Sequence, residues 1–555
     1  MIEALARKLA SAIKGEVQSD SETRARYAQD ASIFYVEPEA VAFPKDISDI
    51  RKIIHFVRVN RAEDKTLSIS PRGAGTDMSG GSLTGSLLVD LTKYIHGVVS
   101  INDREARVLP GTFFRDLERE MDRRGIMMPS FPASKNLCTV GGMVANNSAG
   151  EKTLSYGKTD EYVKELKVLF SDGNEYVIRP LNEKELDQKC SEKNFEGSVY
   201  RGVRALIEKN YDAVVRARPA VSKNSAGYAL WDVWDGRKFD LTKLIVGSQG
   251  TLGVVTEIVF KLVPKKPKTK LAVIFLDSLT ELGSIVNDIL ATKPETLESY
   301  DDQTFVFAVK FFRNFLRQKG IWGSVRLAFS FIPEFFMVLS GGVPKLILLV
   351  EYAESKMAEA DKKSSDLAER MKKYKMTMRF ARSPMEAEKY WSVRRESFNL
   401  LRHNVGGSFH TAPFIDDIVV RPEYLPEFLP KLNKILKEYP ILYTIAGHVG
   451  NGNFHIIPLM NFSDPKTPGV IFELSDRVYD LVFQYRGSIS GEHNDGIIRT
   501  PYLEKMFGKE VTTLFAEVKN IFDPEGIFNP GKKVGGTFSY AREHIHHENA
   551  NNHAS

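Results

Sequence analysis

Four segments rich in glycine and small polar residues constrain the fold of this 555-residue chain most strongly: Ser70–Gly81, Phe131–Gly150, Tyr156–Val163 and Val246–Val254. Glycine lets the backbone approach a ligand closely and turn its N–H groups toward an anion. The first segment matches neither the phosphate-binding P-loop nor the Rossmann fingerprint, and taken alone it is equally well explained as a hairpin that binds nothing. Together, the four segments predict a long, flat ligand such as a dinucleotide, whose pyrophosphate accepts hydrogen bonds from backbone N–H groups.

The chain is too long for a single core, and strand-like runs alternate with helical patterns along most of it. Residues 46–59 and 112–124 have helical spacing, whereas 87–91 and 165–170 have the composition of strands. The Pro/Lys-rich run 261–270 predicts a domain boundary. We therefore expect an α+β protein with five parts: an N-terminal helical segment (1–35), a glycine-loop domain (36–268), a second domain (269–510), a C-terminal segment (511–535) and a disordered tail (536–555).

Three histidines and a carboxylate lie between residues 441 and 494, in a chain with only 11 His. His448 and His455 are seven residues apart, and a glycine bend at the end of a strand can bring both to one side. Two imidazoles and the carboxylate of Glu492 can hold a divalent metal and leave coordination positions open for a substrate. His493 is then left to move a proton. The alternative is a set of structural histidines with satisfied hydrogen bonds and a helix-capping glutamate.

Composition excludes several classes of protein. The net charge of +5 is mild and lacks the concentrated basic stripe of a nucleic-acid binder, so we expect no nucleic-acid partner. The two cysteines, Cys138 and Cys190, provide neither a disulfide framework nor an iron–sulfur cluster, and they favour a reducing, cytoplasmic compartment. Neither a signal peptide nor an apolar run of about 18 residues is evident. The aromatic-rich, basic segment 305–339 is either a buried helical hairpin or an amphipathic surface that meets the inner face of a membrane peripherally.

The glycine segments and the histidine cluster, in this order, resemble the vanillyl-alcohol-oxidase type of FAD flavoproteins over residues 25–535. The resemblance is specific to the D-2-hydroxyacid dehydrogenase branch, which includes D-lactate dehydrogenase, the glycolate oxidase flavin subunit and D-2-hydroxyglutarate dehydrogenase. It implies a PCMH-type FAD-binding domain of two α/β subdomains and a substrate (cap) domain with an antiparallel sheet flanked by helices. Residues 511–535 would return to the flavin.

The resemblance further implies how the cofactor is held. Because the first loop contains no His and the branch does not use the position of Cys138, we expect non-covalent FAD. The FAD-binding residues implied by the resemblance are Pro71, Arg72, Gly73, Ala74, Gly75, Thr76, Ser79, Gly81, Ser134, Gly141, Gly142, Asn146, Gly150, Tyr156, Gly157, Gly250, Val254 and Asn529.

The same resemblance implies roles for the later residues. His493 would be the base that removes the substrate hydroxyl proton, and Asn453 would touch the substrate. Arg394 would bind the substrate carboxylate with its planar donors, although a solvated helical charge is the alternative. A divalent metal, most often zinc in the family, would be held by His448, His455 and Glu492.

One departure from the family bears on the substrate. Relatives that act on 2-hydroxyglutarate carry a Thr four residues after this arginine and a Lys beyond it, whereas this chain has Phe398 and no Lys before Glu423. The departure favours a monocarboxylate. We therefore expect FAD-dependent oxidation of D-lactate, with electrons passing to a separate acceptor such as a quinone, cytochrome or electron-transfer protein. The alternatives are a D-2-hydroxyglutarate dehydrogenase and a non-catalytic flavin subunit of a larger oxidase complex; a homodimer is also an open alternative.

Overall fold

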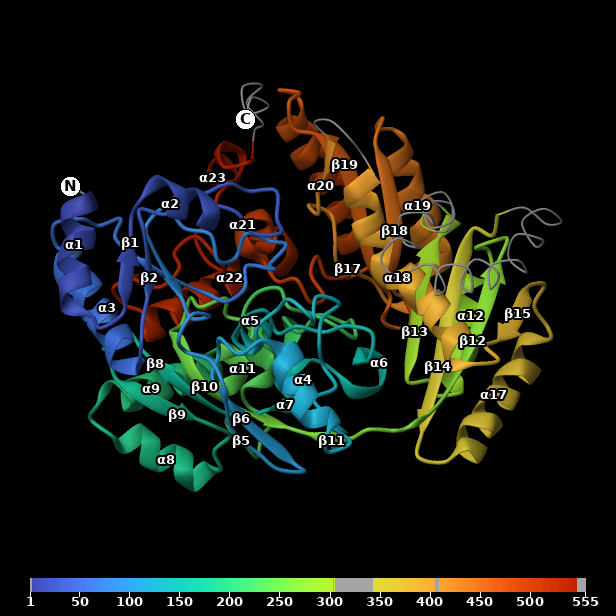
Figure 1. The fold of residues 1–555 in the computed structure, drawn as a ribbon, viewed down its shortest axis with the longest axis horizontal. Coiled ribbons are helices and arrows are strands. Elements are labelled where there is room, and N and C mark those ends of the chain that lie inside the picture. Colours follow the sequence, from blue (N-terminus) through green and yellow to red (C-terminus); the bar gives the residue numbers. More distant parts are fainter. Residues whose placement is uncertain (1, 303, 305–342, 405–408, 547–555) are drawn as a thin grey trace.

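Two bodies lie side by side in the computed structural model, which describes residues 2–302, 304, 343–404 and 409–546 (Figure 1). The blue to green elements and the red elements of Figure 1 form one body, and the yellow-green, yellow and orange elements form the other. Mixed helices and sheets confirm the expected α+β class. The segment 305–339 lies outside the described residues. Among the described residues, the helices are all too short or too polar to cross a bilayer.

The first sheet has the strand order β1-β2-β4-β3 and positions the first glycine segment. Strand β4 (Leu87–Asp90) pairs in parallel with β2 (Ala40–Phe43) and with β3 (Ile69–Arg72). The predicted helix α3 (Ile47–Asn60) connects β2 to β3 and begins at Asp46, whose side chain accepts the N–H of Asp49. The glycine segment follows β3 directly, so it emerges at the carboxyl end of a parallel strand.

The N-terminal segment, expected to be helical, contains a strand as well as helices. Besides α1 (Ile2–Ala12) and α2 (Ser21–Tyr27), it contributes strand β1 (Glu16–Gln18), which pairs antiparallel with β2. Alternation in a three-residue strand is too short to detect in the sequence.

The second sheet, of order β5-β6-β10-β8-β9, is antiparallel throughout. Its central strand follows the glycine segment that ends near residue 254, and helix α9 packs with α22 beside it. Its strands are β5 (Val98–Ile101), β6 (Glu105–Val108), β8 (Val163–Leu169), β9 (Glu175–Ile178) and β10 (Val254–Lys261). The surrounding elements are α4 (Phe114–Asp122), β7 (Ile126–Met127), α5 (Val140–Asn146), α6 (Thr153–Tyr156), α7 (Thr159–Tyr162), α8 (Glu183–Ser191), α9 (Phe195–Lys209), α10 (Tyr211–Arg216), α11 (Thr242–Ile245) and β11 (Val263–Pro264).

The second body is built on an antiparallel eight-stranded sheet of order β15-β12-β14-β13-β18-β19-β16, with β17 also paired to β19. Alternate residues of its central strands enter two different core clusters, so both faces of the sheet are buried. Its strands are β12 (Lys268–Leu276), β13 (Thr296–Asp301), β14 (Leu346–Glu354), β15 (Thr377–Phe380), β16 (Phe409–Thr411), β17 (Ile418–Val419), β18 (Leu442–His448) and β19 (Asn453–Asn461). Its helices include α12 (Leu282–Ala291), α17 (Met357–Met371), α18 (Pro384–Asn404), α19 (Leu425–Lys437) and α20 (Thr467–Gln484).

Helix α18 covers one face of this sheet through Tyr390 and Trp391, which share a core cluster with Val273 and Phe275 of β12. The other face packs against α12, α17 and α19. Arg394, which also belongs to α18, is therefore held at a fixed position over the face that α18 covers.

After the second sheet, the chain returns to the first body through α21 (Gly496–Arg499), α22 (Leu503–Phe522) and α23 (Phe538–Glu543) (Figure 1). Phe528 forms a parallel bridge with Ile69 at the start of β3. The expectation of a disordered tail from residue 536 is wrong up to residue 546, because α23 is a helix whose Ala541 is fully buried. Thr537 caps this helix, and Ile545 is 3% exposed. Residues 547–555 lie outside the described residues.

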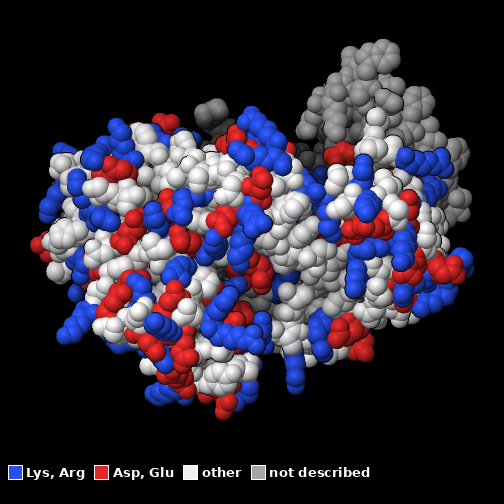
Figure 2. All heavy atoms as spheres, turned by 90° about the horizontal axis from the view of Figure 1, so that it is seen from below, with Lys and Arg blue, Asp and Glu red and all other residues white. Residues whose placement is uncertain are grey.

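The charges of the surface are mixed. On the face shown in Figure 2, the described Lys and Arg side chains are interspersed with Asp and Glu. The functional site is therefore better sought in the interior charge clusters than in a surface field of one sign.

Candidate active site

A glycine hairpin brings the first two histidines together, as the sequence predicts. Strand β18 ends at His448 and β19 begins at Asn453, with His448 opposite Asn453 and Ala446 opposite His455. His448 and His455 are therefore diagonal neighbours on one face of the hairpin. Gly452, in the turn, has a φ of +67°, and a Cβ there would lie 1.7 Å from the backbone oxygen of Val420. Only glycine fits this turn.

The three imidazoles converge on one oxygen. Glu492 Oε1 lies 3.2 Å from His448 Nε2 and 3.4 Å from His455 Nε2. His493 Nε2 is also close, at 3.8 Å. Three ring nitrogens and a carboxylate oxygen thus share one small space.

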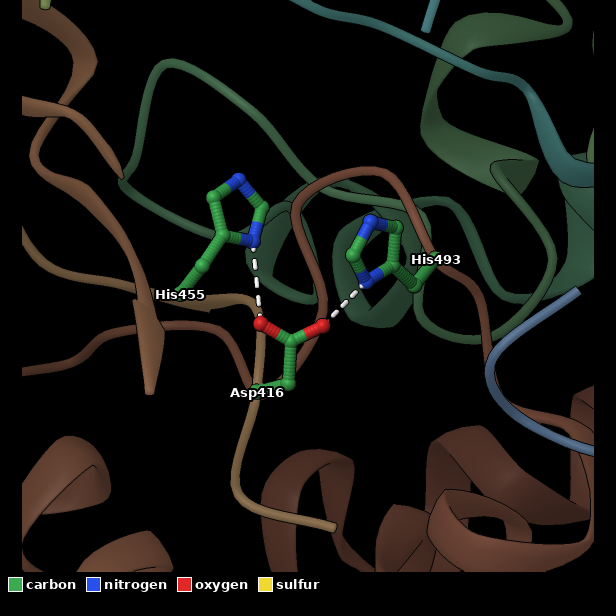
Figure 3. A group of neighbouring side chains, drawn as sticks. All are labelled: Asp416, His455 and His493. Atoms are coloured by element: carbon green, nitrogen blue, oxygen red, sulfur yellow. Dashed lines mark hydrogen bonds and ion pairs between the residues drawn. The ribbon is translucent and has the colours of Figure 1, made fainter. Parts of the chain in front are cut away.

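The opposite nitrogen of each ring is held by a carboxylate. His448 Nδ1 lies 2.6 Å from Glu298 Oε1. Asp416 lies between the other two rings, with Oδ1 3.0 Å from His455 Nδ1 and Oδ2 2.5 Å from His493 Nδ1 (Figure 3). The His448 and His455 contacts are hydrogen bonds, and that of His493 is an ion-pair contact. An ionised carboxylate cannot donate, so it favours a proton on the facing Nδ1, and a neutral ring protonated there presents a lone pair at Nε2.

These carboxylates also shift the pKa values. Burial lowers the pKa of His455, but the charges of Asp416 and Glu492 outweigh burial and raise it to about 10. Burial likewise lowers the pKa of His493, and Asp416 and Asp417 raise it above its ordinary value. Burial raises the pKa of Glu492, whereas Lys223 and the histidines bring it well below its ordinary value. Without a metal, His455 therefore retains its second proton at neutral pH.

A fully buried lysine supports Glu492 from behind. Lys223 Nζ lies 2.6 Å from Glu492 Oε2 and 3.0 Å from Asn453 Oδ1. The amide of Asn453 also donates to Asp417 Oδ1 at 3.0 Å. Asn453 is fully buried and does not line the cavity described below, so its predicted contact with substrate is not supported by its position. Its oxygen and nitrogen are instead used to hold neighbouring residues.

Lysines from the first body fix the loop that carries Glu492 and His493. Lys158 Nζ donates to the backbone oxygen of Gly491 at 2.8 Å, and burial lowers the pKa of this lysine to about 8. Lys533 Nζ lies 2.9 Å from Asp495 Oδ2, and both side chains are fully buried. Together with Lys223, they attach the loop 490–495 to the first body, while Asp417 of the second body accepts the backbone N–H groups of Glu492 and His493.

The arginine predicted to bind the substrate carboxylate is buried and already paired. Arg394 Nη2 lies 3.1 Å from Glu298 Oε2, so Glu298 holds both this guanidinium and His448. The neighbouring Arg395 is held by both oxygens of Glu151, at 3.0 and 3.2 Å. Both arginines line the same cavity as the histidine cluster.

That cavity, of about 600 Å³, extends from the first glycine segment to the histidine cluster. It therefore connects the two features on which the sequence prediction depends. The predicted ligand-binding residues that line it are Pro71, Arg72, Gly73, Ala74, Gly75, Thr76, Gly81, Ser134, Gly141, Gly142, Asn146 and Gly250. The predicted site residues His448, His455, Glu492, His493 and Arg394 line it as well.

Six predicted ligand-binding residues do not line the cavity: Ser79, Gly150, Tyr156, Gly157, Val254 and Asn529. Two of them instead hold the loops in place. Asn529 donates to the backbone oxygens of Gly81 and Gln249 at 2.7 Å and accepts from Ser70, so it fastens two glycine segments together. Tyr156 donates to Glu295 of the second body. A sequence motif records that a residue is needed near a ligand but does not distinguish contact from support.

Comparison with known families agrees with this arrangement. A model of an FAD-binding domain matches residues 38–179, and a model of the C-terminal domain of FAD-linked oxidases matches residues 265–533. The chain belongs to the FAD-linked oxidase family. The segment that matches the FAD-binding domain contains the first glycine loop, at one end of the cavity. The segment that matches the C-terminal domain contains the histidine cluster, at the other end.

Relatives of this chain include enzymes named for 2-hydroxyacids. It is 28% identical over 530 residues to the D-2-hydroxyglutarate dehydrogenase of Pseudomonas putida, covering 94% of this chain and 51% of that protein. It is 26% identical over 520 residues to the glycolate oxidase subunit GlcD of Bacillus subtilis, covering 91% of each. The chain thus spans about half the length of the D-2-hydroxyglutarate dehydrogenases of Pseudomonas putida, Pantoea ananatis and Escherichia coli.

Solved structures share the fold of this chain. p-Cresol methylhydroxylase with substrate bound has a TM-score of 0.68 at 14% identity, covering 96% of this chain and 97% of that one. The 4-ethylphenol oxidase of Gulosibacter chungangensis has a TM-score of 0.67 at 15% identity, with the same coverage. At these identities the likeness concerns the fold alone.

The first glycine loop is suited to the cofactor of the family. The backbone N–H groups of residues 73–78 donate no hydrogen bond to the part of the chain that the structure describes. Gly75 has a φ of +69°, and a Cβ there would lie 2.3 Å from Arg72 Nη2. A pyrophosphate is an acceptor that such free donors can bind. The residues present therefore fit FAD.

A divalent metal also fits the donor set. One oxygen or nitrogen from each of His448, His455 and Glu492 lies within 4.8 Å of the others, and all three side chains are buried. Imidazole and carboxylate donors of this kind suit zinc and similar ions.

Four residues of the site escaped sequence reasoning: Lys223, Glu298, Asp416 and Asp417. Only the adjacent pair Asp416-Asp417 carries a signal, because two acids directly before the apolar run 418–420 are unusual in a buried strand. Lys223 and Glu298 stand in sequences that nothing distinguishes from ordinary loop and strand.

Proposed function

We propose that this protein is an FAD-dependent dehydrogenase that oxidises a D-2-hydroxyacid, with D-lactate as the leading substrate, to the 2-oxoacid. The observation that carries the proposal is the convergence of three histidine Nε2 atoms on Glu492 Oε1, in the cavity that the first glycine loop also lines. A hydroxyacid needs a base for its hydroxyl proton, a cation for its carboxylate and an acceptor for its α-hydrogen. Each of these has a candidate at this cavity.

His493 is the proposed base. Its Nδ1 is held by Asp416, so Nε2 is the nitrogen that receives the hydroxyl proton. Its side chain is 21% exposed, more than those of His448 and His455, which is consistent with access to a substrate. Arg394 is the proposed partner of the substrate carboxylate, with its orientation fixed by Glu298.

Two bound groups complete the proposal. FAD, held without a covalent bond along the glycine loops, would accept the hydride. A divalent ion, zinc being the leading candidate, would be held by His448, His455 and Glu492 and would lower the pKa of the substrate hydroxyl. Non-covalent attachment is supported by Cys138, which lines the cavity but whose pKa is raised to about 12 by burial, so its thiol is unreactive.

D-2-hydroxyglutarate is the second candidate substrate. It is favoured by the name of the Pseudomonas putida relative and by Arg395, a second guanidinium at the cavity. Against it, Glu151 already occupies Arg395 with both oxygens, and Phe398 stands where relatives carry a Thr. Glycolate, named in the Bacillus subtilis relative, belongs in the same comparison.

Anaerobic reduction of the flavin tests the proposal directly. Purified holoprotein is mixed with D-lactate, L-lactate, D-2-hydroxyglutarate or glycolate, with and without a chelator, and bleaching of the flavin absorption is followed. Rapid bleaching by D-lactate supports the leading reading, and preference for D-2-hydroxyglutarate moves the assignment to that acid. A protein that retains flavin but is bleached by no 2-hydroxyacid is instead the non-catalytic subunit of a larger complex.

The electron acceptor, the location and the assembly state are further proposals. We propose transfer to a separate quinone, cytochrome or electron-transfer protein, in the cytoplasm or at the inner face of a membrane. The aromatic-rich, basic composition of the segment 305–339 supports the proposed association with a membrane. Membrane association is tested by co-sedimentation with vesicles, compared between the wild type and a Phe312→Ser/Phe315→Ser variant. Light scattering tests for a homodimer.

A further inference from the structure

Asp416 connects the proposed metal site to the proposed base. It is fully buried in the loop between β16 and β17, and its two carboxylate oxygens face different rings (Figure 3). One oxygen lies 3.0 Å from His455 Nδ1, and the other lies 2.5 Å from His493 Nδ1. The two rings lie nearly parallel, with centroids 5.1 Å apart. One side chain thus holds a candidate metal ligand and the candidate base at a fixed separation.

We infer that Asp416 is a positioning residue that sets the tautomer of both His455 and His493, so that one carboxylate controls metal affinity and proton abstraction together. The inference rests on the proposed function for its catalytic half and on geometry alone for its metal half. A carboxylate offers only acceptors, so both rings must carry their proton on Nδ1. Both neutral rings then present Nε2, unprotonated, toward Glu492 and the cavity.

The backbone around Asp416 is fixed as firmly as its side chain. Arg499, fully buried in α21, donates to the backbone oxygen of Asp416 at 2.7 Å. The next residue, Asp417, accepts the backbone N–H of Glu492 at 2.8 Å and that of His493 at 2.7 Å. Asp417 therefore orients the backbone of the reactive loop, and Asp416 orients the ring that projects from it.

The variant Asp416→Asn separates this inference from a role in packing. Asparagine has nearly the same shape, but one of its two terminal atoms donates rather than accepts. It can therefore satisfy Nδ1–H of only one ring and forces the other ring to carry its proton on Nε2. A ring protonated at Nε2 can neither bind a metal nor accept a proton there.

The test measures both consequences in the same holoprotein preparations. Zinc affinity is determined by competition with a chromogenic chelator, and flavin reduction by D-lactate, or by the best acid of the panel, is determined by stopped flow. If the Asp416→Asn change forces His455 to carry its proton on Nε2, we expect zinc binding to weaken about 10- to 100-fold. If it forces His493 to do so, we expect flavin reduction to slow about 100-fold or more. Asp301→Asn is the matched control. Asp301, at the end of β13, accepts the backbone N–H groups of Thr304 and Ile445. Its variant should leave both the zinc affinity and the rate of flavin reduction unchanged.

A double variant shows which ring carries the effect on rate. If Asp416 acts through His493, adding Asp416→Asn to His493→Gln should slow reduction by less than about threefold beyond His493→Gln alone. If Asp416→Asn does not fold, the pair Asp416→Glu and Asp416→Gln gives the same comparison at equal size, with Glu retaining both acceptors and Gln losing one.

Unchanged zinc affinity together with an unchanged reduction rate in Asp416→Asn, or equal values for the Glu and Gln variants, would overturn the inference. Failure of the proposed function gives a different pattern. In that case no 2-hydroxyacid reduces the wild-type flavin, while the zinc titration still decides whether Asp416 orients His455.

Discussion

Replacing Lys223 by Met should destabilise the metal-free protein by roughly 3 to 5 kcal/mol, the cost of leaving one member of a buried ion pair without its partner. The Lys223 side chain is 0% exposed and that of Glu492 is 5% exposed, with 2.6 Å between Nζ and Oε2. The second bond, at 3.0 Å to Asn453, is lost at the same time. Methionine fills a similar volume, so the loss measures charge and hydrogen bonding rather than a cavity.

A double variant isolates the charge. Glu492→Gln removes the carboxylate that Lys223 neutralises, so the Lys223→Met/Glu492→Gln protein should be more stable than Lys223→Met alone. We expect a coupling free energy of about 1 to 3 kcal/mol. The measurement is urea-induced unfolding followed by tryptophan fluorescence, in the presence of a chelator.

Lys243 provides the matched control for this cycle. It pairs with Asp160 at 2.9 Å in a less buried environment, and its side chain is 17% exposed. Lys243→Met should destabilise the protein by less, and Glu492→Gln should not restore any of that loss. A loss below about 1 kcal/mol for Lys223→Met, or the absence of rescue by Glu492→Gln, would refute the view that Lys223 neutralises this carboxylate.

Four further predictions concern the metal, the stability of the metal-free protein, the flavin and the carboxylate partner. Because the pKa of His455 is raised from 6.5 to about 10, zinc binding must release its proton, so zinc affinity should rise about tenfold per pH unit between pH 7 and 9 in chelator competition; a flat profile would contradict this. By the same shift, the metal-free protein should lose stability in urea as pH rises from 6.5 toward 10. Gly75→Ala should lower the flavin content of purified protein at least about tenfold without changing its far-UV circular dichroism, since its Cβ would meet Arg72. Glu298→Gln, which loosens both Arg394 and His448, should raise KM for the acid and weaken zinc binding, each by about tenfold; an effect on only one of the two would show that Glu298 does not couple them.

Local patterns in the sequence were sufficient for the hairpin and for the first glycine loop. The spacing of His448 and His455 around Gly452 determines that both rings share a face, because an antiparallel turn reverses the chain within a few residues. The backbone N–H groups of residues 73–78, which stay free within the described part of the chain, are likewise predictable from the glycines that follow a parallel strand. In both cases the geometry depends on neighbours in the chain.

The supporting residues depend on neighbours in space, and the sequence offers no local record of them. Lys223 lies 269 positions from Glu492, and Glu298 lies 150 positions from His448. A buried charged residue can be recognised in a sequence only when its partner is known, because most charged residues lie on the surface. The same limit explains Asn529: its motif places it near the flavin, yet its hydrogen bonds show that it ties loops together.

The attachment of the loop 490–495 bears on how this protein can be divided. The loop 490–495 comes from the region that matches the second family model. Lys158, which donates to the backbone oxygen of Gly491, and Lys223, which pairs with Glu492, come from the other side of the linker. A recombinant fragment starting at residue 265 would keep every proposed zinc ligand while leaving Glu492 without its counter-ion. Such a fragment should bind zinc poorly until the missing half is added in trans.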